Sequence, residues 1–400
     1  MTDSPDQASS APPQWLYRLL ALLIFAYTAS YLLWYSGTAL GLAPVLDSKE
    51  NLTFAWQMAN GELPTEPFYR APLYPALLGL LQMLTGDIGL TVLFGRIFNG
   101  FCHLASTALC FAIAARLWRS RWSGLFAAAL FGFNPVVLWF TGDLLDIAAG
   151  ITLFLGALLV ALPALLPNGE KLLLRRGLLC GLLLVLAIYT RPHFLPPAII
   201  LTALLIWRCR LAAMPAFAAF GIGLLAFGSV NLLRSGEFKI LPTQGPYNLW
   251  AANKPGANGK FFVQSIMIQG GKLHENPNRL ESLYLYQQQT ADPSPTLAES
   301  NAFWSRAFRE YALDNPAALM RHLLAKAFYL LHNHEQYNNK TYSVHKGLSP
   351  TLAFNPLGFG LLVLFALCSL ALANRADWPS LWPILLLAAA FAAGVALYYT

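Results

Sequence analysis

The chain has 400 residues, of which 56% are hydrophobic and 11% are charged, and its formal net charge is +7. Soluble domains carry about 25% charged residues, so this composition and the repeated long apolar runs exclude an ordinary soluble protein. The basic residues lie in short stretches between apolar runs, without the interleaved aromatic residues of a nucleic-acid-binding surface. We therefore predict an all-α integral membrane protein, a polytopic helical bundle, because helices satisfy their own backbone in lipid.

The first 87 residues are predicted to contain a tail, one span and a long loop. Residues 1–14 are polar and rich in Pro and Ser, which predicts disorder. They have no basic n-region and no small-residue cleavage motif, so the span at about 15–35 is expected to be an anchor and not a cleaved signal peptide. In the loop at 36–87, the apolar run at 72–84 is too short to cross and is predicted to be interfacial or re-entrant.

Apolar runs up to residue 233 complete a predicted transmembrane core at 15–233. These runs cover about 88–118, 122–140, 147–166, 177–189, a segment that ends near 208, and 211–233. Basic residues gather in alternate loops: Arg116, Arg119, Arg121, Lys171, Arg175, Arg176, Arg208 and Arg210. The positive-inside rule makes these loops cytoplasmic, so the amino terminus is expected inside and the loop at 36–87 outside.

Residues 234–352 interrupt this pattern and are predicted to be an external segment of mixed structure. Its one moderately apolar helix, at 316–331, carries Arg321, His322 and Lys326, which favour a place on the membrane surface. The last two spans are predicted within 353–400, for about nine spans in total.

The five cysteines lie in or at the ends of apolar runs and show no spacing of a disulfide framework or a zinc motif. They are predicted to be small core residues.

Two pairs of carboxylates lie in the predicted external loops. Asp47 and Glu50 are three residues apart and would share a helix face, and Asp143 and Asp146 repeat that spacing in the turn after the third span. Carboxylates from two loops on one side could meet in one cleft, where one would serve as a base for an attacking hydroxyl. The alternative is that they are solvated span-end charges or helix caps.

Three arginines, Arg70, Arg96 and Arg191, are predicted on the same side of the membrane. A cation or a metal ion is needed wherever a phosphate leaves, because negative charge grows there in the transition state. Arg191 precedes Pro192, where the fifth span ends, and the alternative for it is that the side chain snorkels to lipid phosphates.

Two stretches of the external segment carry further candidates. LPTQGPYNLWAANKPGANGKFF is dense in Gly, Asn, Pro and aromatic residues, which suits sugar stacking and equally suits any folded loop. HNHEQYNNKTYSVH contains His332, His334, Glu335 and His345. A divalent metal ion is one alternative there, but histidines two residues apart face poorly matched directions on a helix or strand, so no metal ligand is assigned.

Several pieces in this order resemble one family: LDSKENLTFAWQMANGELP with FYRAPLYPALLGLL, FTGDLLD, YTRP, GPYNLWAANKPGANGKF and HNHEQYNN. The chain is similar in these stretches to the GT-C class of polyprenyl-phosphate-sugar-dependent glycosyltransferases, and within it to the bacterial branch related to protein O-mannosyltransferases, with an RgtA/B/C/D-like domain. Two departures stand out: many relatives have Asp-Glu where this chain has Asp47-Ser48, and many continue past the last span, whereas this sequence stops at Thr400.

The resemblance implies a bacterial inner-membrane enzyme with an external active site. Its donor would be a sugar on undecaprenyl or a similar polyprenyl phosphate, and its acceptor a glycan, lipid or protein. Asp47 would be the base of an inverting displacement, Asp143 a second acid near the acceptor or a metal, and Arg191 a contact to the donor phosphate. The other residues expected to bind substrate are Glu50, Arg70, Tyr74, Arg96, Asp146, Asn253 and Glu335.

Two other functions are alternatives. A transporter or flippase for an amphiphile would be expected to show internal repeats and interrupted polar helices, which the sequence lacks. A non-catalytic assembly protein of the cell envelope would use the external segment as a docking surface.

Overall fold

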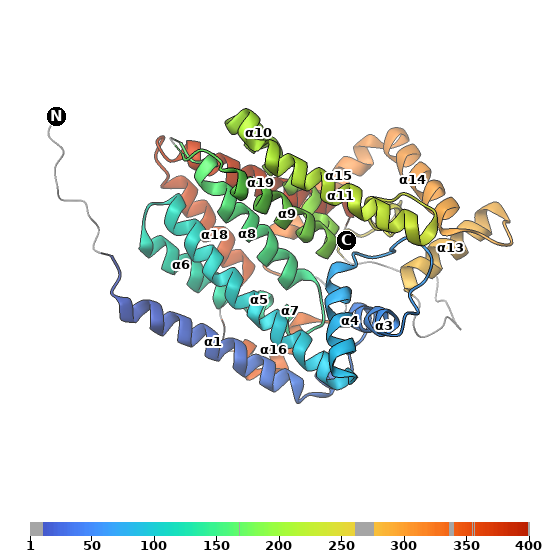
Figure 1. The fold of residues 1–400 in the computed structure, drawn as a ribbon, viewed down its shortest axis with the longest axis horizontal. Coiled ribbons are helices and arrows are strands. Elements are labelled where there is room, and N and C mark those ends of the chain that lie inside the picture. The colour runs from blue at the N-terminus through green and yellow to red at the C-terminus, as the bar shows by residue number, and fades with distance from the viewer. Residues whose placement is uncertain are drawn as a thin grey trace.

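The structure is a computed structural model that describes residues 11–167, 169–260, 276–335, 340–353, 355 and 357–398. These residues form helices and loops and contain no strand, so the prediction of an all-α protein is confirmed for them (Figure 1). Most of the predicted disordered tail, residues 1–10, lies outside the described residues, as does the stretch 336–339 of the His-rich motif.

Five helical stretches among the described residues are long and apolar enough to cross a membrane. They are α1 (Gln14–Ser36), α5 (Ile88–Leu117), α8 (Ile147–Leu165), the stretch Pro192–Ser235, and α19 (Trp378–Tyr398). A sixth is obtained if α6 (Arg121–Gly132) and α7 (Pro135–Thr141), which are bent by 56° relative to one another, form one span. The chain therefore has the helix lengths and the composition of a membrane-embedded protein, with fewer spans by these criteria than the nine predicted.

The bend between α6 and α7 follows from the sequence Phe133-Asn134-Pro135. The Asn134 side chain accepts hydrogen bonds from the backbone N–H groups of Val136 and Val137, at 3.0 and 3.1 Å, and so caps α7. Pro135 has no N–H to give to α6 but fits the first turn of a new helix. The predicted third span is consequently two helices.

The stretch Pro192–Ser235 reverses direction and is two long helices. It contains η1 (Pro192–Phe194), α10 (Leu195–Cys209), η2 (Arg210–Ala213) and α11 (Met214–Ser235). The preceding helix, α9 (Leu174–Thr190), packs parallel to α11: Gly181 lies against Ala216 near one end, and Tyr189 stacks on Phe227, with 4.1 Å between ring centroids, near the other. Because α9 and α11 run the same way, α10 between them runs the opposite way.

Two short helices from the first loop cover one end of the bundle. These are α3 (Asp47–Ala59) and α4 (Leu73–Thr85), preceded by α2 (Ala39–Leu42), and we call this end the α3 end. In Figure 1, α3 and α4 lie next to each other at the end of the bundle away from α6. The apolar run predicted to be too short to cross is α4, which has 13 residues.

The last two-fifths of the described chain wrap around the core. The helices are α12 (Gly245–Asn253), α13 (Pro277–Thr290), α14 (Leu297–Asp314), α15 (Pro316–Leu331), α16 (Tyr342–Leu348), α17 (Pro350–Ala353) and α18 (Phe359–Ala371). The helix predicted at 316–331 is α15. With 13 residues, α18 is about 20 Å long, shorter than the ~30 Å hydrocarbon core of a bilayer.

Apolar residues of α8, α9, α10 and α11 form the largest buried cluster, which also receives Phe194 and Leu387. All five cysteines are free; Cys102 and Cys180 are buried as predicted, whereas Cys368 on α18 is exposed. The four-helix core gives the loops at the α3 end a rigid base.

Candidate functional site

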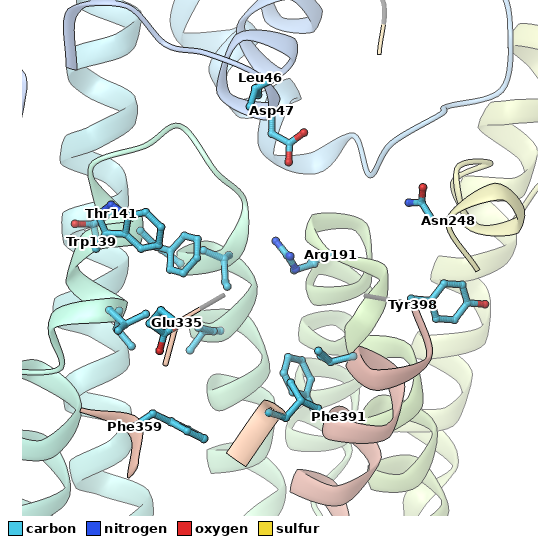
Figure 2. A pocket seen from close by; sticks show the side chains of 18 of the residues that line it. Leu46, Asp47, Trp139, Thr141, Arg191, Asn248, Glu335, Phe359, Phe391 and Tyr398 are labelled. Atoms are coloured by element: carbon cyan, nitrogen blue, oxygen red, sulfur yellow. The ribbon is translucent and has the colours of Figure 1, made fainter. Parts of the chain in front are cut away.

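One cavity of about 1440 Å³ opens between α3, α7, the amino-terminal turns of α8, and the ends of α9 and α19. Figure 2 shows Asp47 on one side of it, Arg191 and Tyr398 on another, and Phe359 and Phe391 at a deeper level. Asp47 and Arg191 therefore lie at the α3 end of the cavity, whereas Phe359 and Phe391 lie farther from it, with Glu335 on the wall near Phe359. A cavity with both charged and apolar walls suits an amphiphilic ligand.

The acidic side of the cavity is the first turn of α3. Asp47 and Glu50 both lie in this turn, and both line the cavity. The unpaired N–H groups at a helix amino terminus stabilise negative charge there by about 0.3–1 kcal/mol. Leu46, the residue before the helix, has a φ of 49°, a value that side chains disfavour, and it also lines the cavity.

Arg70 joins the two carboxylates. Its Nη1 lies 2.7 Å from Asp47 Oδ1 and 2.6 Å from Glu50 Oε2. These carboxylates raise the pKa of Arg70 well above its usual value, although its burial acts in the opposite direction. Asp47 and Glu50 share one helix face as predicted, and both contact the same cation. Arg70 lies behind the two acids and not on the cavity wall.

Arg191 occupies the other charged position of the cavity. It ends α9, and its Nη1 lies 2.8 Å from Asp146 Oδ1. Asp146 also helps to raise the pKa of Arg70, which means that the two ion-pair groups are close together. Asp146 does not itself line the cavity and reaches it only through its ion pair with Arg191. The predicted meeting of carboxylates from two loops in one cleft is therefore not seen: of these acids, Asp47 and Glu50 of the first loop line the cavity.

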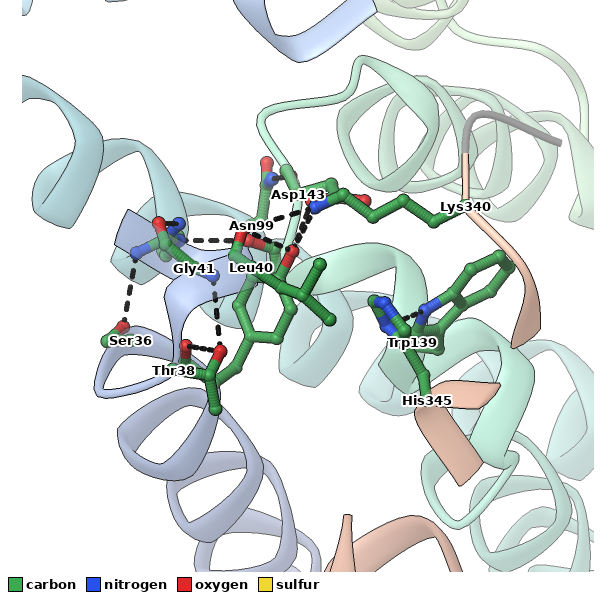
Figure 3. Close-up of polar contacts among 12 residues, drawn as sticks. Ser36, Thr38, Leu40, Gly41, Asn99, Trp139, Asp143, Lys340 and His345 are labelled. Carbon is green, nitrogen blue, oxygen red and sulfur yellow. Dashed lines mark hydrogen bonds and ion pairs between the residues drawn. The ribbon is translucent and has the colours of Figure 1, made fainter. Parts of the chain in front are cut away.

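Asp143, the other acid of that turn, is elsewhere. Residues 142–146 form a bend and not a helix, so Asp143 and Asp146 diverge although they are three residues apart. Asp143 is 7% exposed, lies 2.5 Å from Lys340 Nζ and accepts a 2.6 Å hydrogen bond from the Tyr35 hydroxyl (Figure 3). It does not line the cavity that Asp47 lines, which opposes its assignment as a second catalytic acid.

Three further predicted site residues also lie off the cavity wall. Arg96 is buried and donates to the carbonyl oxygens of Gly142 and Gly41, which fixes the loop after α1 to the turn before α8. Tyr74 is buried in the apolar contact between α4 and α5. Asn253 is buried too, but its side chain touches Lys326, which does line the cavity.

Amide side chains complete the α3 end of the cavity, and none of the three was predicted as an individual site residue, although Asn248 lies in the Asn-rich stretch noted in the sequence. Asn276, at the start of α13, donates a 2.8 Å hydrogen bond to Glu50 Oε2, and Asn278 lies beside Asn248 of α12. All three asparagines line the cavity. Amides beside carboxylates are a usual set of partners for sugar hydroxyls, because they offer donors and acceptors together.

Glu335, which was predicted to bind substrate, lies on the cavity wall with His332 and His334. Burial raises the pKa of Glu335, and the two histidines oppose that shift. Within the described ranges, no three His, Cys, Asp or Glu side chains are arranged to hold a metal ion.

The fold and the cavity together define an all-α protein with membrane-length helices and an amphipathic cavity at one end. Comparison of the chain with protein families, with curated proteins and with solved structures gives no match in any of the three.

Proposed function

We propose that the protein is a membrane glycosyltransferase that moves a sugar from a polyprenyl phosphate to an acceptor hydroxyl. The observation that carries this proposal is a cavity whose wall holds Asp47, Glu50 and Arg191 together with apolar side chains. Arg70 and Asp146 pair with these charged groups from behind the wall. A prenyl-linked sugar has the same division into a polar head and a long apolar tail.

The tail would lie along the apolar part of the cavity, whose walls include Ile151, Phe359 and Phe391. Burial of such a chain contributes about 0.8 kcal/mol per CH₂ group. The phosphate would lie at Arg191, because a guanidinium matches phosphate oxygens and Asp146 holds it in place. The sugar would lie toward the asparagines beside Glu50.

Asp47 would act as the base. The acceptor oxygen attacks the anomeric carbon, and its proton passes to the Asp47 carboxylate. The bond between that carbon and the phosphate oxygen breaks, and its electron pair leaves with the polyprenyl phosphate, so that the configuration inverts. Arg191 would stabilise the growing charge on the phosphate, and Arg70 would hold Asp47 in position.

We further propose a bacterial inner-membrane location with about nine spans and the α3 end outside. The reversal at η2 supports two spans in Pro192–Ser235, and Trp207 contacts Trp382 at the end of α10 remote from the α3 end. The loops at this remote end carry Arg116, Arg119, Arg121, Lys171, Arg175, Arg176, Arg208, Arg210 and Arg375. Their charge favours a cytoplasmic position.

The test is sugar transfer by the purified protein in lipid nanodiscs. Defined polyprenyl-phosphate sugars are mixed with fractionated envelope glycans and lipids, and products are read by mass spectrometry. We expect Asp47→Asn to reduce transfer by at least about 10²-fold while the protein stays folded. Glu62→Gln, a matched change at an exposed acid of the same loop, should leave the rate unchanged. Transfer by the Asp47→Asn variant at the wild-type rate would exclude Asp47 as the base.

The amphipathic cavity also fits a flippase, which is the second candidate. Transbilayer movement of a fluorescent polyprenyl-phosphate sugar in proteoliposomes, with no covalent product, would favour it over the transferase.

A further inference from the structure

Lys326 of α15 is a buried cation on the wall of the same cavity. Lys326 is 2% exposed, and its Nζ donates a 3.1 Å hydrogen bond to Asn253 Oδ1. Among the described residues this is its one hydrogen bond, and it has no carboxylate there within 4.0 Å. A lysine ammonium has three donors, so two are left for a ligand or for water in the cavity.

Asn253 is oriented so that its oxygen must face Lys326. Its amide nitrogen donates to the carbonyl oxygens of Leu249 and Leu397, at 2.9 and 2.7 Å. The Leu397 carbonyl lies in the last turn of α19, where the helix dipole supplies partial negative charge, and the Leu249 carbonyl lies in the middle of α12. Lys326 is thus placed by neutral groups only, and its full positive charge has no full negative charge to match it in the described structure.

The loop after α12 covers the stem of Lys326. Gly259 has a φ of 69°, and a Cβ at this position would lie 3.2 Å from Lys326 Cγ and 3.3 Å from His322 Cε1. His322, one turn before Lys326, donates a hydrogen bond from Nε2 to the Ala252 carbonyl oxygen, 3.0 Å away. Burial lowers the pKa of His322. The stem of Lys326 is therefore closely packed against Gly259 and lies one helical turn from His322.

Lys326 is electrostatically separate from the cations beside α3. Arg70 and Arg191 each pair with carboxylates, whereas burial alone lowers the pKa of Lys326 to about 8, without a contribution from Asp47, Glu50 or Asp146. A buried ammonium is costly unless an anion pairs with it. A ligand that brought an anion to this wall of the cavity would remove that cost.

We propose that Lys326 forms a second anion-binding subsite of the cavity, distinct from Arg191, which binds a phosphate-type oxyanion carried by the acceptor. Lysine suits this ligand because it is a compact charge with several donors. That this oxyanion belongs to the acceptor rests on the proposed transferase function, whereas the binding of an oxyanion at Lys326 does not depend on that function. The acceptor class is then an anionic molecule, such as a phosphorylated glycan or lipid headgroup.

Selective acetylation tests the subsite without any need for sugar transfer. The full-length protein in nanodiscs of phosphatidylcholine is treated with a low concentration of acetic anhydride at a series of pH values from 6 to 10. The extent of acetylation of each lysine is measured by mass spectrometry. Because only the neutral amine reacts, Lys326 should react with a midpoint near pH 8. Inorganic phosphate should slow its acetylation several-fold, since it stabilises the ammonium. Lys239, a half-exposed lysine paired with Glu237, is the internal control and should not respond.

Polyprenyl phosphate distinguishes the two sources of an oxyanion. If Lys326 serves the acceptor, inorganic phosphate should still protect it in nanodiscs saturated with polyprenyl phosphate and in an Arg191→Gln variant. No slowing by phosphate would overturn the proposal. Protection by polyprenyl phosphate that abolishes the effect of inorganic phosphate would also overturn it, because Lys326 would then bind the donor. Protection in a protein that forms no glycoside would retain the subsite and reject only the transferase.

Discussion

Lys340 and Asp143, 197 residues apart in sequence, form a buried ion pair with 2.5 Å between Nζ and Oδ1. Their side chains are only 6% and 9% exposed. Lys340 also donates to the Tyr35 hydroxyl of α1, so one side chain ties the segment after α15 to two parts of the core (Figure 3). Asn99 of α5 donates a 2.7 Å hydrogen bond to the Asp143 backbone and fixes the same turn from the other side. The pair therefore acts as a structural link beside the site.

The first prediction concerns this link. Replacement of one partner leaves the other as an unpaired buried charge, so Asp143→Ala and Lys340→Met should each lower the free energy of unfolding by about 3–5 kcal/mol. The double variant should lose less unfolding free energy than the sum of the losses of the two single variants, because it leaves no unpaired buried charge. Unfolding in detergent, followed by near-UV circular dichroism, measures this cycle. Costs that add without coupling would mean that the pair does not exist in solution.

The second prediction is a pH dependence at His345 of α16. Trp139 Nε1 donates to His345 Nδ1 at 2.6 Å, and an indole can only donate, so this nitrogen must be unprotonated. Burial and the charge of Lys340 lower the pKa of His345, while Asp143 acts against them. The His345 ring also contacts Tyr35, and the Tyr342 ring packs against Trp139.

The pKa of His345 is lower in the folded protein than in the unfolded chain. The stability that neutral His345 contributes is therefore complete above pH ~6.5 and decreases as the pH falls below that value toward the pKa of the folded state. His345→Gln keeps an acceptor for Trp139 but cannot titrate. The stability difference between wild type and this variant should shift in favour of the variant as the pH falls below about 6.5, by at most about 1.4 kcal/mol per pH unit. Parallel stability curves for the two proteins would show that His345 does not titrate in this way.

The third prediction tests the parallel contact of α9 and α11. A Cβ on Gly181 would lie against the Ala216 carbonyl oxygen, well inside van der Waals contact. Gly181→Ala should therefore destabilise the protein by about 1–3 kcal/mol. Gly221→Ala, on α11 with open space around it, is the matched control and should be neutral or stabilising by up to about 1 kcal/mol. Thermal unfolding in nanodiscs gives both values, and equal behaviour of the two variants would contradict the packing described.

The fourth prediction separates the charge of Arg70 from its shape. Arg70→Met leaves Asp47 and Glu50 without their shared cation, and we expect a loss of sugar transfer of about 10²–10³-fold. Arg70→Lys should recover part of it, because one nitrogen contacts both carboxylates. Arg176→Met, which breaks an exposed pair with Glu170 at the other end of the bundle, is the control and should keep full activity. Full activity of Arg70→Met would mean that Asp47 needs no positioning.

Local sequence features determined much of the fold and part of the site. Apolar periodicity and length predicted α1, α5, α8 and α19 and the helix at 316–331, and an acid pair three residues apart predicted the shared face of α3. These features depend on neighbouring residues, which sequence contains directly. Asp47, Glu50, Arg191 and Glu335 were predicted as site residues with the help of the family resemblance, and all four line the cavity.

Tertiary structure alone decided which of two acids in one turn reaches the charged group. The bend at 142–146 turns Asp143 toward Lys340 and Asp146 toward Arg191, and their spacing could not distinguish these outcomes. Lys326 was likewise read as a surface charge from its place in an amphipathic helix, until Asn253 and the ends of two distant helices proved to surround it. The physical reason is common to both: the partner of a buried charge lies far away in sequence, and only packing brings the two together.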